Sequence, residues 1–194
     1  MQGVANVLSF IVEVEQLKAV IRKTKPVGLD RYENSAEHSW HVCLSALMLK
    51  DYAKLDIDIN RVIKMLLIHD LGEIDAGDTI IYASETVENK LKEEAGIVRL
   101  LSILPSASQQ EYLALWREFE QGKTSDAVFA KAVDRIPPLL HNLNGGGHSW
   151  NKHQISKEQV LALNSARISA VLPDVWQELE RQLTLAAERG IFEE

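Results

Sequence analysis

Residues 65–73 read MLLIHDLGE, in which four apolar residues precede a histidine and an aspartate. The apolar residues continue a helical pattern that starts at Val62, so we expect His69 and Asp70 in the last turn of a helix that Gly72 ends. A carboxylate carried toward an apolar core is unfavourable unless a charged or hydrogen-bonding group receives it. The stretch therefore predicts a helix that delivers two polar side chains to the interior, where a metal ion would be one such receiving group.

Apolar residues recur at helical spacing along almost the whole chain. The stripe from Val7 to Ile21 predicts a first helix. Asn34 precedes a glutamate by three residues and Ser156 precedes a glutamine by three, which is the spacing of capping boxes at the starts of two further helices. No segment alternates with a period of two for long enough to predict a strand. The pattern predicts an all-α protein.

Proline, glycine and capping residues divide this pattern into separate helices. Asp58 or Asn60 is expected to cap the helix that carries His69. Pro137 and Pro138 are expected to kink or break the helix that carries Asp134, because the proline ring removes an amide donor and clashes with the preceding turn. The remaining expected helices cover residues 87–101, beyond a polar stretch that ends at Ser84, then 112–119, Thr124 or Ser125 to Ile136, Ser156 to Ile168, and the residues that follow Pro173.

The composition is that of an ordinary globular domain. The chain has 194 residues, of which 46% are hydrophobic and 25% charged, and this excludes a disordered or collagen-like chain. We expect a single domain over residues 1–194, with a core over roughly 5–145 and helices over 156–189 packed on it. The one cysteine, Cys43, cannot form an internal disulfide and is expected to be a small buried apolar residue.

The net charge limits the partners. With 21 basic and 28 acidic residues the formal net charge is −7, which gives no general field for holding nucleic acid or an anionic membrane. No apolar run approaches the ~18 residues that span a bilayer, and the first residues lack the basic segment of an export signal. We therefore expect a cytoplasmic protein that binds neither nucleic acid nor a membrane, and that holds any phosphate ligand through local cations or a metal.

Three segments supply candidate metal ligands, namely His38, the His69-Asp70 pair and Asp134. Two imidazoles and two carboxylates suit a divalent ion, and four protein ligands leave an octahedral ion two positions for water or substrate. Each of these residues alone is more often a solvated or locally hydrogen-bonded side chain. The combination in one helical chain is what favours a metal site.

The same ordered set resembles the signature of the HD-domain metal-dependent phosphohydrolases. The Glu37-His38 pair, residues 67–73 and the Gly77-Asp78 pair also resemble the small bacterial HD-domain 5′-deoxynucleotidases, and the likeness covers roughly residues 5–145. The resemblance implies a compact single-domain HD-type helical bundle. It also implies that His38, His69, Asp70 and Asp134 hold one divalent ion, with Mn, Co, Mg, Ni, Zn and Fe not distinguished.

Two further acidic residues match functional positions of that family. Glu73 resembles the catalytic glutamate, and its spacing from His69 and Asp70 puts its carboxylate on their side of a continued helical turn. The sequence does not decide whether Glu73 gives or takes a proton, and it could equally be a solvated residue just past a helix end. Asp78 resembles a residue that orients substrate or water, and its alternative role is simple turn chemistry beside Gly77.

Cations upstream of the Glu37-His38 pair are candidates for binding a phosphate monoester. Arg22 resembles the phosphate-contacting arginine of the family, and Lys23 and Arg31 lie close to it in the chain. Lys23 stands where the family resemblance would place a tryptophan, which leaves the choice of substrate open. The alternative is a solvated helix end whose basic residues complement the helix dipole.

Other histidines, glycines and tryptophans bear on the number of metal ions, the pocket and the core. No histidine lies between Leu71 and Val133, which favours one metal ion over the two of related phosphodiesterases and di-iron oxygenases. His141 is expected at the surface or behind the metal ligands, with lining of the pocket as the alternative. Residues 145–150, rich in glycine, are a candidate for a lid. The tryptophans Trp40, Trp116 and Trp176 are expected in the core or at an interface.

These inferences predict a phosphohydrolase that removes phosphate from a nucleoside or deoxynucleoside 5′-monophosphate. The rival hypothesis is a non-catalytic HD module that binds metal and senses a nucleotide. Because members of the family often form dimers, the resemblance also implies a homodimer.

Overall fold

Helices in the structure start where the sequence carries capping signals. The computed structural model describes residues 2–79 and 86–192. The Asn34 side chain accepts a hydrogen bond from the Glu37 backbone N–H, and the Glu37 carboxylate accepts one from the Asn34 backbone N–H, which confirms the predicted capping box. The same reciprocal pair forms at Ser156.

Across the described ranges most residues are helical, which confirms the all-α prediction. No strand forms within these ranges, where extended pairing is confined to an isolated bridge between Ile21 and Asn34. The predicted polar stretch up to Ser84 lies mostly outside the described residues. The α-helices are α1 (Gln2–Glu13), α2 (Ser35–Leu49), α3 (Ile59–Ile68), α4 (Glu73–Ala76), α5 (Val87–Leu101), α6 (Ser106–Gln121), α7 (Ser125–Asp134), α8 (Ile136–Asn144), α9 (His148–Lys152), α10 (Lys157–Ser169) and α11 (Pro173–Glu188), and the 3₁₀ helices are η1 (Val14–Ala19) and η2 (Lys50–Tyr52).

The first predicted helix is shorter than the sequence indicated. The α-helix ends at Glu13, and the residues up to Ala19 form the 3₁₀ helix η1, so the prediction of one helix from Val7 to Ile21 was wrong. Backbone pairing explains the change. The Arg22 N–H donates to the Glu33 carbonyl, and the Glu33 N–H donates to the Thr24 carbonyl, which holds the chain after η1 in an extended conformation.

Gly72 has a different role from the predicted helix stop. Helix α3 ends at Ile68, and Gly72 has ordinary helical angles, with φ −63° and ψ −24°, instead of the left-handed angles of a terminating glycine. A Cβ at Gly72 would lie 2.5 Å from the Glu93 carbonyl oxygen of α5, and a Cβ at Gly96 would lie 2.8 Å from the Gly72 carbonyl oxygen. The two glycines let the turn after α3 pack directly on the α5 backbone.

The proline pair breaks the predicted helix as expected. Helix α7 ends at Asp134 and α8 begins at Ile136, with the two prolines in the first turn of α8, where their missing N–H groups are tolerated. Arg135, which separates the two helices, keeps helical angles, and the break places Asp134 at the end of α7.

The glycine-rich segment that follows α8 is anchored to the protein at its C-terminal end. The Asn142 side-chain oxygen accepts hydrogen bonds from the Ser149 N–H, the Ser149 hydroxyl and the Trp150 N–H. Trp150 is buried and stacks on Phe192, with ring centroids 4.7 Å apart. These contacts anchor the C-terminal end of this segment at Ser149 and Trp150, whereas Gly145 and Gly146 are exposed, and the role of a lid stays a prediction.

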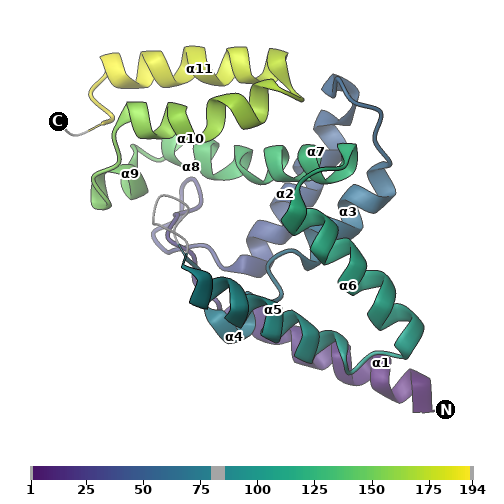
Figure 1. The fold of residues 1–194 in the computed structure, drawn as a ribbon. Coiled ribbons are helices and arrows are strands. Elements are labelled where there is room, and N and C mark those ends of the chain that lie inside the picture. Colours follow the sequence, from purple (N-terminus) through teal and green to yellow (C-terminus); the bar gives the residue numbers. More distant parts are fainter. Residues whose placement is uncertain (1, 80–85, 193–194) are drawn as a thin grey trace.

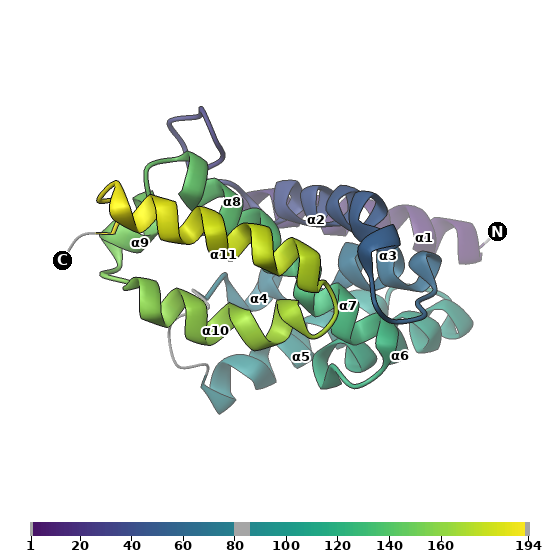
Figure 2. The same cartoon turned by 90° about the horizontal axis from the view of Figure 1, so that it is seen from above.

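The helices form layers around one core. Figure 1 shows α10 and α11 running antiparallel above α7 and α8, with α4, α5 and α1 below them, and α10 contacts both α11 and α7. Figure 2, seen from above, and Figure 1 agree in placing the two chain ends at opposite sides of the molecule. The chain therefore forms a compact helical bundle, as predicted.

Aromatic residues differ in how they relate to this core. Trp116 and Trp176 are buried, as predicted, whereas Trp40 is 65% exposed and is not a core residue. Cys43 is buried, in agreement with its predicted role as a small apolar residue. None of the helices in the described part of the chain combines the length and the apolar character needed to cross a bilayer.

Candidate metal centre

Three packed helices bring distant polar side chains to one point. His38 comes from the first turn of α2, His69 directly follows α3, and Asp134 is the last residue of α7. His38 Nε2 lies 2.8 Å from Asp134 Oδ1, and His69 Nε2 lies 3.5 Å from the same oxygen. One ligand atom from each of the three lies within 4.8 Å of the others. Among the described residues, this is the only group of three or more histidine, cysteine or acidic side chains arranged closely enough to hold an ion.

The orientation of His69 fits a metal ligand. Its Nδ1 lies 2.8 Å from the Leu66 carbonyl oxygen, which can only accept, so Nδ1 carries a proton and Nε2 is the nitrogen that a metal ion would take in exchange for a proton. Nε2 is buried and has no hydrogen-bond partner in the described chain. A buried nitrogen without a partner is unfavourable, and a cation between the imidazoles and the carboxylate would satisfy it.

Asp70 lies beside the three-residue cluster and connects it to an arginine. Its Oδ1 is 3.1 Å from His69 Nε2, while its Oδ2 accepts a hydrogen bond of 3.0 Å from Arg22 Nη1. The structure therefore brings His38, His69 and Asp134 together and places Asp70 beside His69, outside the group of three side chains that is close enough to hold an ion.

The charges of the cluster favour a cation. Burial alone would raise the pKa of Asp134, but the adjacent imidazoles of His38 and His69 hold it well below its usual range. Burial also opposes a charged His69, but the carboxylates of Asp70 and Asp134 outweigh burial and raise the pKa of His69 to about 9. Negative charge thus stabilises a positive charge placed among these side chains, whether a proton or a metal ion supplies it.

Arg22 is held by carboxylates on three sides. In addition to Asp70, its guanidinium lies 3.4 Å from Glu33 Oε2 and 3.8 Å from Asp78 Oδ1. Burial would lower the pKa of Arg22, but these carboxylates and Glu73 raise it, so the side chain stays charged. A fixed cation beside the cluster can bind an anionic group that approaches the metal site.

Glu33 was missed by the sequence analysis. It is only 2% exposed, and its Oε2 accepts a hydrogen bond of 2.8 Å from the Thr24 hydroxyl. The same oxygen lies 3.9 Å from His38 Nδ1 and 3.8 Å from His141 Nδ1. Glu33 therefore places a negative charge near both Arg22 Nε and His38 Nδ1, without a hydrogen bond to either atom. No sequence signal marked it, because a glutamate in a polar stretch before a helix is usually solvated.

Glu73 reaches the cavity from the first residue of α4. Its Oε2 accepts a hydrogen bond of 2.6 Å from the Ser35 hydroxyl, which fixes the carboxyl group. Burial, with a further contribution from the charge of Asp70, raises the pKa of Glu73 to about 9, although Arg22 opposes the shift. A carboxyl group that keeps its proton near neutral pH can act as a general acid.

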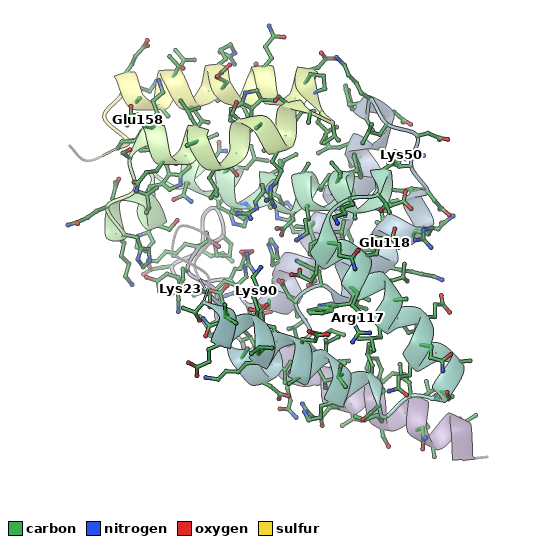
Figure 3. All side chains as sticks on the ribbon, in the orientation of Figure 1. Lys23, Lys50, Lys90, Arg117, Glu118 and Glu158 are labelled. Atoms are coloured by element: carbon green, nitrogen blue, oxygen red, sulfur yellow. The ribbon has the colours of Figure 1, made fainter. Side chains whose placement is uncertain are left out.

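A cavity of about 360 Å³ opens onto the cluster. Its acidic and histidine side chains include His69, Asp70, Glu73 and Asp134, and its lining also carries cations. Those cations include Lys131, Arg135 and Arg167, which were absent from the sequence prediction. Figure 3, in which Lys23 and Lys90 are labelled, shows polar side chains gathered between α5 and the layer formed by α7, α8 and α10.

The remaining predicted site residues divide into two groups. Lys23 and Asp78 line a neighbouring cavity together with Arg22. Arg31 is 52% exposed in its side chain and forms a bidentate pair with Glu37, at 2.8 and 2.6 Å, so the structure does not bring it to the cluster. The positions of Arg22, Lys23 and Arg31 in the sequence do not indicate which of their side chains points into the protein.

His141 lies behind the cluster and does not line the cavity of His69. Its ring stacks on His41 with centroids 5.4 Å apart, and its Nδ1 faces Glu33. Burial lowers the pKa of His141, so this imidazole tends to stay neutral. His141 therefore lies behind the candidate ligands, as expected, and the alternative that it lines this cavity is wrong.

Known proteins share both the sequence pattern and the architecture. A family model described as the HD domain matches residues 14–176. The 5′-deoxynucleotidase HDDC2 of Xenopus laevis is 31% identical over 140 residues, which are 71% of this chain and 68% of that protein. The 5′-deoxynucleotidase HDDC2 of Bos taurus is 29% identical over 143 residues, which are 72% of this chain and 67% of that protein.

Solved structures extend the likeness to the whole fold. The crystal structure of a predicted metal-dependent phosphohydrolase from Magnetospirillum magnetotacticum MS-1 matches with a TM-score of 0.92 and 39% sequence identity. The match covers 98% of this chain and 96% of that one. A conserved hypothetical protein from Pyrococcus furiosus, 22% identical with a TM-score of 0.67, covers 90% of this chain and 99% of that one and shares the fold.

Proposed function

This chain belongs to the HD-domain family, and from that premise we propose that it removes phosphate from a nucleoside or deoxynucleoside 5′-monophosphate with the help of a divalent ion. The observation that carries the proposal is the buried His69 Nε2, which lacks a hydrogen-bond partner in the described chain and faces the carboxylates of Asp70 and Asp134. The proposed substrate class is supported by the 5′-deoxynucleotidases among the relatives.

One divalent ion is proposed to bind His38, His69, Asp70 and Asp134. Imidazole and carboxylate ligands suit Mn, Co, Mg, Ni, Zn or Fe, and this ligand set does not choose among them. When bound, such an ion supplies Lewis-acid chemistry, because it polarises a phosphoryl group and lowers the pKa of water.

Arg22 is proposed to bind the phosphate. Its Nη1 already donates to Asp70 Oδ2 at 3.0 Å, which positions the guanidinium beside the cluster with further donors available. A phosphate monoester brings nearly two negative charges to a protein with a net charge of −7, so fixed cations are needed to bind it. Lys23 contributes at the edge of the site, where its side chain is exposed.

Glu73 is proposed to move the proton of the reaction. The Ser35 hydroxyl holds Glu73 Oε2 at 2.6 Å, which leaves the other carboxyl oxygen for the reacting groups. Since its pKa is raised by burial, Glu73 can hold a proton at neutral pH and give it to the departing sugar oxygen. Asp78 is proposed to orient the substrate beside Arg22.

The proposal also covers the location, the oligomeric state and the partners of the protein. We place it in the cytoplasm as a homodimer that binds neither nucleic acid nor a membrane. The net negative charge supports the exclusion of anionic polymers. Exposed apolar side chains on α1, including Val4, Leu8 and Val12, support self-association.

A panel of nucleoside 5′-monophosphates, each tested with Mn²⁺, Co²⁺ and Mg²⁺, tests this function. We expect release of inorganic phosphate that depends on the ion, and a loss of at least about 100-fold in kcat for Glu73→Gln with metal binding retained. Glu88→Gln is the matched control, because Glu88 is exposed on α5 and pairs with Lys92. Metal binding without phosphate release from any substrate would support the non-catalytic sensor instead.

A further inference from the structure

Buried polar atoms without partners gather around the neighbouring cavity. Arg22, Asp78, Arg135 and Asn164 all line this cavity. In the described part of the molecule, five buried atoms of these residues lack a hydrogen-bond partner, namely Arg22 Nε, Asp78 Oδ2, Arg135 Nε, Arg135 Nη1 and Asn164 Oδ1. Buried polar groups in folded proteins are normally satisfied, so such a concentration around one cavity points to a ligand that completes them.

Arg135 presents donors to the cavity. Its side chain is 15% exposed, and its nearest recorded carboxylate oxygen, Asp134 Oδ2, is 3.8 Å from Nε, beyond hydrogen-bond distance. Arg135 lines both this cavity and the one that contains His69 and Asp134. A molecule that reaches from the metal site into the neighbouring cavity therefore passes the Arg135 guanidinium.

Asn164 presents an acceptor from α10. Its Nδ2 donates to the Val160 carbonyl oxygen at 2.8 Å, which fixes the amide and leaves Oδ1 unused. The residue has no exposed surface, so bulk water does not compensate for the missing bond. Asn142, on the same cavity, differs because its Oδ1 accepts three hydrogen bonds from Ser149 and Trp150 and its Nδ2 donates to Pro138. Asn164 is thus the amide that is free to bind a ligand.

The mixture of donors and acceptors selects the kind of ligand. A second phosphate dianion could accept from Arg135 and from Arg22 and Lys23, which line the same cavity, but it would leave Asn164 Oδ1 without a donor and would face the Asp78 carboxylate. A hydroxyl group both accepts and donates, so it can take a hydrogen bond from Arg135 and give one to Asn164. The neighbouring cavity therefore matches a hydroxylated group better than a second phosphate.

We propose that Arg135 and Asn164 bind the sugar 3′-hydroxyl of the substrate, and that they determine specificity for nucleotides over other phosphate monoesters. This inference rests on the proposed function, since it assumes that the phosphate of a nucleotide lies at the metal site. It assigns recognition of the sugar to the junction of α7 with α8 and to α10, outside the cluster of proposed ligands.

The test compares substrates with and without the hydroxyl. For the native protein, kcat/KM for a 2′-deoxynucleoside 5′-monophosphate should exceed that for the 2′,3′-dideoxynucleoside 5′-monophosphate by about 10- to 100-fold. In Asn164→Leu, which removes the acceptor at similar volume, this ratio should fall toward one, and kcat/KM for p-nitrophenyl phosphate should stay within about threefold. Arg135→Met should lower the ratio as well, and Arg135→Lys should restore part of it.

Asn144→Leu is the matched control. Asn144 donates through Nδ2 to the Leu140 carbonyl oxygen, the same contact to the residue four positions earlier that Asn164 makes, but Asn144 is exposed. Its substrate ratio should equal that of the native protein.

The outcomes separate this inference from the proposed function. If the native protein hydrolyses both nucleotides with equal kcat/KM, or if Asn164→Leu keeps the native ratio, the hydroxyl subsite is wrong although the hydrolase activity stands. If the native protein releases phosphate from no nucleotide, the proposed function itself fails. Should Asn164→Leu not fold, the comparison of the two nucleotides on the native protein and the Arg135 variants still decides the matter.

Discussion

Replacing Gly72 by alanine should destabilise the protein although its backbone conformation suits alanine. At Gly72 the added Cβ would lie 2.5 Å from the Glu93 carbonyl oxygen and 3.1 Å from the Glu93 Cα. Both contacts are with backbone atoms, which cannot rotate away as a side chain can. The turn that carries Asp70 and Glu73 must then move away from α5.

The size of the effect follows from two opposing contributions. Overpacking of this kind costs about 3 kcal/mol at the upper end of its usual range. Replacing a glycine in helical conformation by alanine returns about 1 kcal/mol. The net loss is therefore about 2 kcal/mol, which lowers Tm by about 4–8 °C in a domain of this size. Activity should fall further than stability alone explains, because Glu73 is the next residue and small displacements of catalytic groups are costly.

Thermal unfolding followed by circular dichroism measures this prediction, with phosphate release assayed well below Tm. Gly96→Ala should behave similarly, since its Cβ would lie 2.8 Å from the Gly72 carbonyl oxygen. Gly3→Ala is the control, because the nearest atom to its Cβ, Pro105 Cγ, is at an ordinary 3.9 Å. A Tm for Gly72→Ala equal to or above that of the native protein would refute the packing argument.

Three other side chains give independent predictions. Burial raises the pKa of the Cys43 thiol to about 11. An aromatic disulfide reagent at pH 8 should therefore leave the folded protein unmodified and react with Cys43 only after unfolding. Rapid modification of the native protein would contradict this prediction. Trp150→Ala should lower the free energy of unfolding by about 3–5 kcal/mol in denaturant titrations. The reason is that this large aromatic side chain is only 1% exposed and stacks on Phe192. A loss below about 1 kcal/mol would be inconsistent with that packing. Arg31→Ala should keep kcat/KM for nucleotides within about twofold, since Arg31 pairs with Glu37 on the surface, and a tenfold decrease would return Arg31 to the site.

Local signals in the sequence predicted much of the fold. The capping boxes at Asn34 and Ser156 mark helix starts because the side chain and the backbone that satisfy each other are only three residues apart. The proline pair likewise predicted the break between α7 and α8. The helical pattern failed after Ala19, where hydrogen bonds to residues 33–35 hold the chain extended, because those partners are distant in sequence.

In the candidate site too, the sequence indicated some residues and missed others. The chemistry of His38, His69 and Asp134 favoured a metal cluster, and the structure brings these side chains together. Glu33 and Asn164 escaped detection because their roles depend on burial among residues from other helices, which no pattern within their own segments reveals. The assignment of ligand and substrate roles, and of the domain limits at 5–145 and 156–189, stays a prediction.

The stoichiometry of metal binding is the decisive measurement. Isothermal titration of the chelator-treated protein with Mn²⁺, checked by elemental analysis after dialysis, should give about one ion per chain for the native protein. Asp134→Asn should weaken binding at least about tenfold, because it removes the carboxylate that lies within 3.5 Å of both imidazoles. Absence of any bound ion, or an Asp134→Asn variant that binds Mn²⁺ as tightly as the native protein, would contradict the proposed metal centre.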